Sequence, residues 1–124
     1  MTTKRPVFLE IWRVKLPIPG IVSILHRLSG VLMVLSIPVF TALFAQALSG
    51  PDGFAAAAAF VGHPLIKLTL LLLGWALLHH LFAGIRYLII DFGWGVDLPT
   101  ARMTAWTALS AALLVTIVGG GMLL

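Results

Sequence analysis

Three long apolar runs constrain the fold of this 124-residue chain more than any other feature of its sequence. They extend over about residues 21–48, 64–90 and 104–124, and the third run contains no charged residue. An α-helix rises 1.5 Å per residue, so about 20 apolar residues are enough to cross roughly 30 Å of hydrocarbon. The sequence therefore predicts an all-α membrane protein with three transmembrane helices.

The composition indicates the same class and excludes several kinds of site. Hydrophobic residues make up 60% of the chain and charged residues 10%, and the mean hydropathy is +1.11, far outside the soluble range. There is no cysteine, so the chain cannot ligate an iron–sulfur cluster, and it has no glycine-rich dinucleotide motif. We expect one domain over residues 1–124, with any iron–sulfur or dinucleotide-dependent redox centre on other chains.

Basic residues are unevenly distributed around the three runs. Those before the first run and after the second are Lys4, Arg5, Arg13, Lys15 and Arg102. Only Lys67 lies near the other connection. The positive-inside rule then predicts a cytoplasmic N-terminus and a C-terminus outside. Topology and lipid headgroups explain the net charge of +4, so we expect membrane lipid and no nucleic acid as a partner.

The connections between the runs contain helix breakers. Residues 49–53 hold Gly50, Pro51 and Gly53, and the alanine run that follows them can form a short helix before Pro64. Residues 91–103 are expected to form a loop. Residues 17–20 (Pro-Ile-Pro-Gly) are expected to separate the first span from an amphipathic stretch along the cytoplasmic interface.

Polar side chains gather at one predicted level of the membrane. The start of the first span and the end of the second must lie at the same cytoplasmic level if consecutive spans are antiparallel. The residues expected in this layer are Ser23, His26, Arg27, His79, His80, Arg86, Tyr87 and Asp91. Ionisable groups at membrane depth are candidates for a functional site.

The spacing of histidine and glycine in this layer favours a haem site. His80 is followed four residues later by Gly84, and His26 by Gly30. Such spacing puts an imidazole and a missing side chain on one helix face, which suits an axial ligand beside a flat macrocycle. His80 lies roughly 9 Å deeper than Arg86, which would leave the arginine near the membrane edge to pair with haem propionates.

A purely structural role is the alternative for these residues. Membrane histidines often bridge helices, glycines let helices approach closely, and arginines can extend to the lipid headgroups. His79 points about 100° away from His80, so the two cannot ligate one iron, and we expect His79 to be structural. Ser23 and Arg27 lie one turn apart and would present a hydroxyl and a guanidinium to one neighbour.

Four motifs carry a resemblance to a known family. They are residues 5–7 (Arg-Pro-Val), 23–30 (Ser-Ile-Leu-His-Arg-Leu-Ser-Gly), 80–86 (His-Leu-Phe-Ala-Gly-Ile-Arg) and 91–93 (Asp-Phe-Gly). In order and spacing, over nearly the whole chain, they resemble the large cytochrome b membrane-anchor subunits of succinate dehydrogenase, respiratory complex II. The resemblance implies a multi-pass subunit of the cell inner membrane that shares one haem b with a second small anchor subunit. It also implies a flavoprotein and an iron–sulfur subunit, which carry the FAD and the clusters, and a quinone that accepts the electrons of succinate.

The resemblance also implies roles for single residues. His80 matches the haem axial ligand, and the second ligand would come from the partner anchor. Ser23 and Arg27 match positions that line the quinone pocket, and His26 and Arg27 would approach the haem propionates. Where some members have histidine after Gly-Ile-Arg, this chain has Tyr87. The predicted site thus combines quinone-binding Ser23 and Arg27, the ligand His80, supporting His26, Arg27 and Arg86, and haem-packing Gly30 and Gly84.

The resulting hypothesis is a non-autonomous subunit of succinate dehydrogenase that forms a quinone site and holds no complete active site of its own. Two alternatives remain at this point. One is the anchor of a quinol:fumarate reductase, which runs the same reaction in reverse. The other is a haem-free structural or transport subunit, in which the polar layer bridges helices or passes protons.

Overall fold

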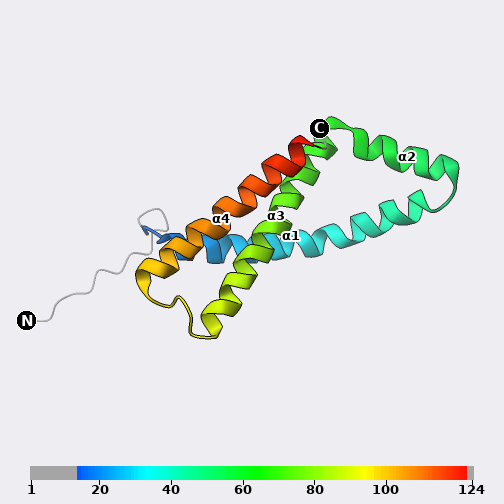
Figure 1. The fold of residues 1–124 in the computed structure, drawn as a ribbon. Helices are drawn as coiled ribbons and strands as arrows, with labels where there is room; N and C mark the ends of the chain where they lie inside the picture. The colour runs from blue at the N-terminus through cyan, green and yellow to red at the C-terminus, as the bar shows by residue number, and fades with distance from the viewer. Residues whose placement is uncertain (1–13, 123–124) are drawn as a thin grey trace, which may run out of the picture.

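The computed structural model describes residues 14–122, and all of the regular structure in that range is helical (Figure 1). Helix α1 spans Ile18–Ala47, α2 spans Pro51–Gly62, α3 spans Pro64–Asp91 and α4 spans Leu98–Gly121. Helices α1, α3 and α4 are long and apolar enough to cross a membrane. The prediction of three transmembrane helices is confirmed, and the direction in which they cross stays a prediction.

The first span begins earlier than the sequence suggested. We expected residues 17–20 to form a separate linker, but α1 already begins at Ile18. Pro19 lies in its first turn, where the missing N–H of proline breaks no helical hydrogen bond. The predicted interfacial stretch before this helix falls largely outside the described residues.

The third span also begins earlier, at Leu98 rather than at residue 104. The cause is a helix cap at Asp97, within the residues that we expected to form a loop. The Asp97 carboxylate accepts hydrogen bonds from the Thr100 N–H at 3.0 Å and from the Thr100 hydroxyl at 2.8 Å, and Pro99 occupies the first turn. The bond from the Thr100 N–H, followed by that from its hydroxyl, holds the pKa of Asp97 below its ordinary value.

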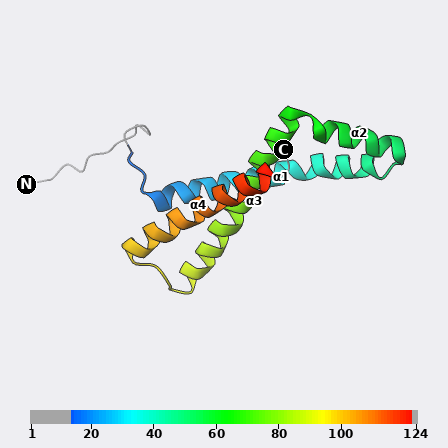
Figure 2. The same ribbon diagram turned by 45° about the horizontal axis from the view of Figure 1, so that its top comes forward.

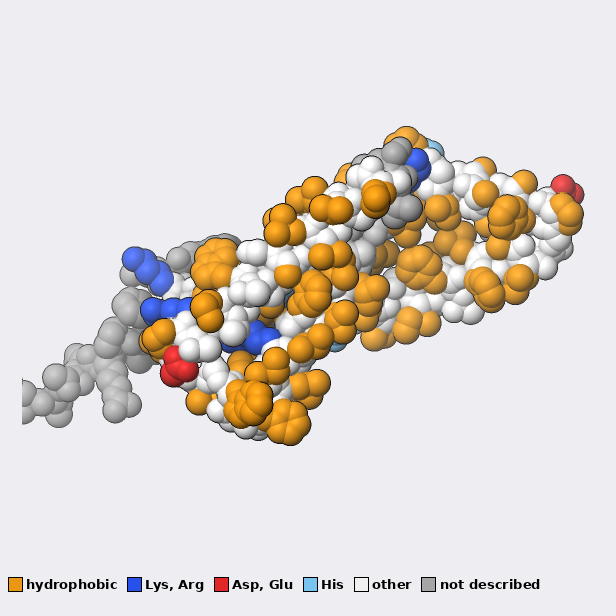
Figure 3. Space-filling view, viewed as in Figure 1, with side chains coloured by type: hydrophobic (Ala, Val, Ile, Leu, Met, Phe, Trp, Pro, Cys, Tyr) orange, Lys and Arg blue, Asp and Glu red, His pale blue; other side chains and the backbone are white. Residues whose placement is uncertain are grey.

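Small residues form the contact between the three long helices. Helix α3 packs against both α1 and α4, and α1 crosses the pair (Figures 1 and 2). Val22 of α1, Ala83 of α3 and Ala105 of α4 form the centre of this contact and are fully buried. Helices in lipid associate through close packing of small residues, because lipid tails are as apolar as leucine. The interior of the bundle accordingly contains mainly small residues, and large apolar side chains cover its lateral surface (Figure 3).

Helix α2 confirms the short helix expected at the alanine run. It lies along the second half of α1 and leads back to the start of α3 (Figure 1). Gly50 precedes it with φ of 128°, a value that favours glycine. Exposed His63 follows it and accepts a hydrogen bond from the Leu65 N–H, so that α3 begins with a side-chain cap.

Candidate functional site

Two histidines and two glycines interlock where α1 and α3 cross. A Cβ atom built on Gly30 of α1 would lie 3.1 Å from Cε1 of His80, and one built on Gly84 of α3 would lie 3.6 Å from Nε2 of His26. The two imidazole rings stack with their centroids 4.0 Å apart and an interplanar angle of 14°. Each glycine therefore leaves room for a histidine of the opposite helix, whereas the sequence suggested room for a macrocycle.

The ring of His80 is held by hydrogen-bonding groups of α1. Its Nδ1 lies 3.0 Å from the backbone carbonyl oxygen of His26 and 3.1 Å from Oγ of Ser29. Ser29 is 1% exposed, and its hydroxyl donates to the same carbonyl at 2.8 Å. Sequence reasoning missed Ser29, although its position three residues after His26 and next to Gly30 places it on the same side of the helix.

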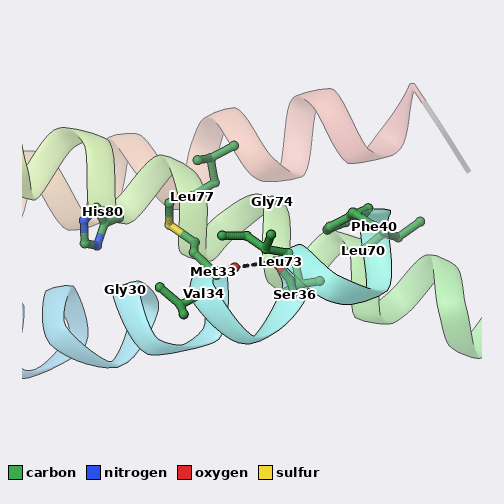
Figure 4. A pocket seen from close by; sticks show the side chains of 11 residues that line it. Gly30, Met33, Val34, Ser36, Phe40, Leu70, Leu73, Gly74, Leu77 and His80 are labelled. Carbon is green, nitrogen blue, oxygen red and sulfur yellow. Dashed lines mark hydrogen bonds between the residues drawn. The ribbon is translucent and has the colours of Figure 1, made fainter. Parts of the chain in front are cut away.

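An apolar groove between α1 and α3 begins at His80. Figure 4 shows His80 at one end of the groove and Phe40 and Leu70 at the other. Its volume is about 730 Å³, within the range of small-molecule and cofactor sites. The apolar lining includes Met33, Val34, Ile37, Leu73 and Leu77, together with Gly30 and Gly74.

Ser23 and Arg27 lie one turn apart near the start of α1. Ser23 is half-buried and Arg27 is exposed. Among the residues that the structure describes, neither side chain has a hydrogen-bond partner. Figure 3 shows lysine and arginine gathered toward the end of the molecule where α1 and α4 begin, which is the end that holds this pair.

His26 and Tyr87 complete the polar cluster on this side of the crossing. His26 stacks on His80 and meets the edge of the Tyr87 ring, with centroids 5.3 Å apart at 71°. The Tyr87 hydroxyl is buried and has no hydrogen-bond partner within residues 14–122. Because the rings of His26 and His80 are stacked nearly parallel, they cannot ligate one metal ion from opposite sides.

His79 lies apart from this cluster. It is 0% exposed and stacks on Trp75, with centroids 5.3 Å apart and an interplanar angle of 20°. Neither ring nitrogen has a hydrogen-bond partner in the described part of the chain. The groove residues do not include His79. The two neighbouring histidines of α3 thus occupy different surroundings, one inside the bundle and one at the groove.

Arg86 of α3 is a buried residue with partners on α4. It is 7% exposed, its Nε donates to Oγ1 of Thr104 at 3.0 Å, and its terminal NH2 group donates to the carbonyl oxygen of Ala101 at 3.0 Å. Its guanidinium carbon also lies 5.5 Å from the Tyr87 ring centroid. In the structure Arg86 therefore joins α3 to α4, and its expected role toward haem propionates stays a prediction.

Replacing Arg86 by methionine is expected to weaken the contact between α3 and α4. The substitution keeps an apolar stem but removes two charge-assisted hydrogen bonds, leaving the Ala101 carbonyl without that partner. We expect the free energy of unfolding in mixed micelles to fall by about 1–3 kcal/mol. Thr104→Val should lower it by less, and Arg102→Met, at an exposed arginine of α4, should change it little. Equal stability of Arg86→Met and Arg102→Met would contradict the assignment.

Comparison with known proteins gives this architecture a family. A model of the succinate dehydrogenase/fumarate reductase transmembrane subunit matches residues 1–119. The chain is 33% identical over 121 residues to the succinate dehydrogenase cytochrome b556 subunit of Coxiella burnetii, covering 97% of each protein. It is 29% identical over 113 residues to the b556 subunit of Paracoccus denitrificans, covering 91% of this chain and 87% of the relative.

A relative named as a cytochrome b560 subunit also matches most of the chain. The succinate dehydrogenase cytochrome b560 subunit of Reclinomonas americana is 27% identical over 124 residues, covering 95% of this chain and 85% of the relative. The family match at residues 1–119 includes α1, α3, the polar cluster between them and most of α4. The chain thus belongs to the family of succinate dehydrogenase/fumarate reductase transmembrane subunits.

Proposed function

We propose that this chain is the anchor of a succinate:quinone oxidoreductase that binds haem b together with a second anchor subunit and forms part of the quinone site. The observation that carries the proposal is His80, held by α1 at the end of an apolar groove within the membrane-spanning part of the bundle. The chain contributes residues to both sites and holds no complete active site.

The residues around His80 fit one half of a haem site. Among its two ring nitrogens, only Nδ1 contacts hydrogen-bonding groups of the described residues. Nε2 would therefore be the atom that binds a ligand. No cluster of three or more histidine, cysteine or acidic side chains able to hold a metal ion occurs in the range 14–122. A haem needs no such cluster, because the macrocycle supplies four ligands and the protein only axial ones. When bound, the haem would supply reversible one-electron chemistry, and the second axial ligand would come from the partner anchor.

The pair Ser23 and Arg27 suits the recognition of a quinone. A hydroxyl and a guanidinium can both donate hydrogen bonds to a quinone carbonyl oxygen and stabilise the negative charge that develops on it during reduction. As a cationic donor, Arg27 would orient the quinone and stabilise this developing charge. Its exposure near the start of α1 would let a quinone enter from the membrane edge.

The distribution of charge supports a location for the partner subunits. Lys15 and Arg102 lie at the end where α1 and α4 begin, while Lys67 lies at the opposite end, near the start of α3. By the positive-inside rule we infer that the first end faces the cytoplasm and that the chain resides in the inner membrane. The flavoprotein and iron–sulfur subunits, with FAD and the clusters, would dock there and pass electrons from succinate to the quinone.

The proposal is tested by purifying the chain with its bound partners in mild detergent. We expect large flavin and iron–sulfur subunits and a b-type reduced-minus-oxidised spectrum that dithionite produces fully, together with succinate-driven quinone reduction. Faster quinol-driven fumarate reduction under matched conditions would favour the fumarate reductase alternative. A preparation that lacks haem and those partners would overturn the proposal in favour of a structural or transport subunit.

A further inference from the structure

We propose that the His26 carbonyl and the Ser29 hydroxyl fix His80 in the tautomer protonated at Nδ1, so that Nε2 is the atom presented to the haem iron, while Gly30 sets the position of the ring. Ser29 and Gly30 are then positioning residues. This inference rests on the proposed haem site, since it concerns how the chain prepares its own ligand.

The tautomer follows from what each neighbouring group can donate. A backbone carbonyl oxygen only accepts hydrogen bonds, and the one of His26 lies 3.0 Å from Nδ1 of His80. If Nδ1 carried a lone pair, two lone pairs would face each other across this distance. With the proton on Nδ1, the contact becomes a hydrogen bond. Nε2 is then the nitrogen that keeps a lone pair and can ligate a metal.

Ser29 strengthens this preference because its own proton is already committed. Its hydroxyl donates to the His26 carbonyl at 2.8 Å, a local bond within one turn of α1. The hydroxyl rotor is therefore held, and its oxygen is left as an acceptor 3.1 Å from Nδ1. Since Ser29 is 1% exposed, water does not compete for these groups. The Nδ1–H of His80 thus meets two acceptors, one from the backbone and one from a buried side chain.

Both Gly30 and His26 lie against the ring of His80. His26 stacks on it in near-parallel orientation. A Cβ on Gly30 would lie 3.1 Å from Cε1, the ring atom between the two nitrogens. This approach is tighter than ordinary van der Waals contact, so a methyl group there would shift the ring and Nε2 with it. Gly30 also lines the groove, which links the ring position to the proposed binding space.

The hydrogen bonds have a consequence for the electronic character of the ligand. A group that accepts a hydrogen bond from Nδ1–H makes Nε2 a stronger electron donor to a metal, and it fixes the orientation of the imidazole. A stronger donor favours the ferric over the ferrous state. Removing the Ser29 acceptor is therefore expected to raise the midpoint potential, while moving the ring at Gly30 changes the ligand orientation.

The test compares Ser29→Ala and Gly30→Ala with wild type in the complete purified complex. The control is Thr41→Val, which removes an exposed hydroxyl that bonds within α1 but lies outside the groove. Haem content, the midpoint potential from a redox titration and the low-spin ferric electron paramagnetic resonance spectrum are recorded. We expect Ser29→Ala to retain haem with a raised midpoint potential. Gly30→Ala should shift the highest g value and lower haem occupancy, and Thr41→Val should match wild type.

Different outcomes separate this inference from the function on which it rests. A wild-type complex without haem would overturn both. A haem-containing complex in which Ser29→Ala and Gly30→Ala have wild-type potentials and spectra would overturn only the positioning roles. If one of the two variants fails to assemble, the other still decides, because the two act on the same ring through different contacts. A shift in Thr41→Val equal to that in Ser29→Ala would also overturn the inference, since it would trace the effect to helix α1 in general.

Discussion

His80→Ala is expected to lower the haem occupancy of the purified complex or change the spectrum of its haem, while its three spans remain in the membrane. The substitution removes the imidazole at the end of the groove, and the groove lining contains no other histidine. His26 stacks parallel to the lost ring, and His79 is buried on another side of α3. With one axial ligand gone, the b-type spectrum should disappear or change to that of a five-coordinate haem. Visible spectroscopy and haem extraction of the complex measure this.

The neighbouring histidine provides the control for this experiment. His79→Phe keeps an aromatic ring stacked on Trp75 and removes two nitrogens that have no hydrogen-bond partner in the described residues. We expect this variant to retain haem with an unchanged spectrum. A full and spectrally normal haem complement in His80→Ala would show that the ligand assignment is wrong. Loss of haem in both variants would point to a general loss of assembly.

The second large effect is expected at the proposed quinone site. Arg27→Gln removes the cationic donor and should lower quinone reduction by about 10²-fold, because one lost donor to a developing oxyanion costs on the order of 10²–10³ in rate. Ser23→Ala should lower it by less and raise the quinone KM, since a neutral hydroxyl makes a weaker bond. Succinate oxidation with a soluble dye as acceptor should change little, because the dye takes electrons before the membrane site.

The ratio of the two activities decides this prediction. Ser110→Ala, at an exposed serine of α4, is a matched control that should leave both rates at wild-type values. Equal losses with quinone and with dye in Arg27→Gln would mean that the arginine serves assembly. Wild-type quinone kinetics in both Arg27→Gln and Ser23→Ala would remove these residues from the quinone site.

Features of the fold that depend on local hydropathy were easier to predict from the sequence than the positions at which the helices begin. Membrane spans follow from local hydropathy, so the three long helices were predictable from the sequence. The predicted polar layer followed in turn from the alternating direction of consecutive spans. The helix starts at Ile18 and Leu98 were misplaced, because prolines and glycines marked a loop where they occupy the first turn of a helix or precede its cap. In both cases the start of the helix depended on a cap or on a proline in the first turn, and the overall composition of the segment did not reveal it.

By itself, the sequence determined the membrane class and the number of spans, since hydropathy depends only on neighbours along the chain. Only the tertiary structure decided how α1 and α3 rotate against each other. That rotation places His80 on the His26 carbonyl, Ser29 and Gly30, sets His26 against Gly84, and turns Arg86 toward α4. Such contacts depend on crossing geometry and on small residues that permit close approach, which helical periodicity does not encode.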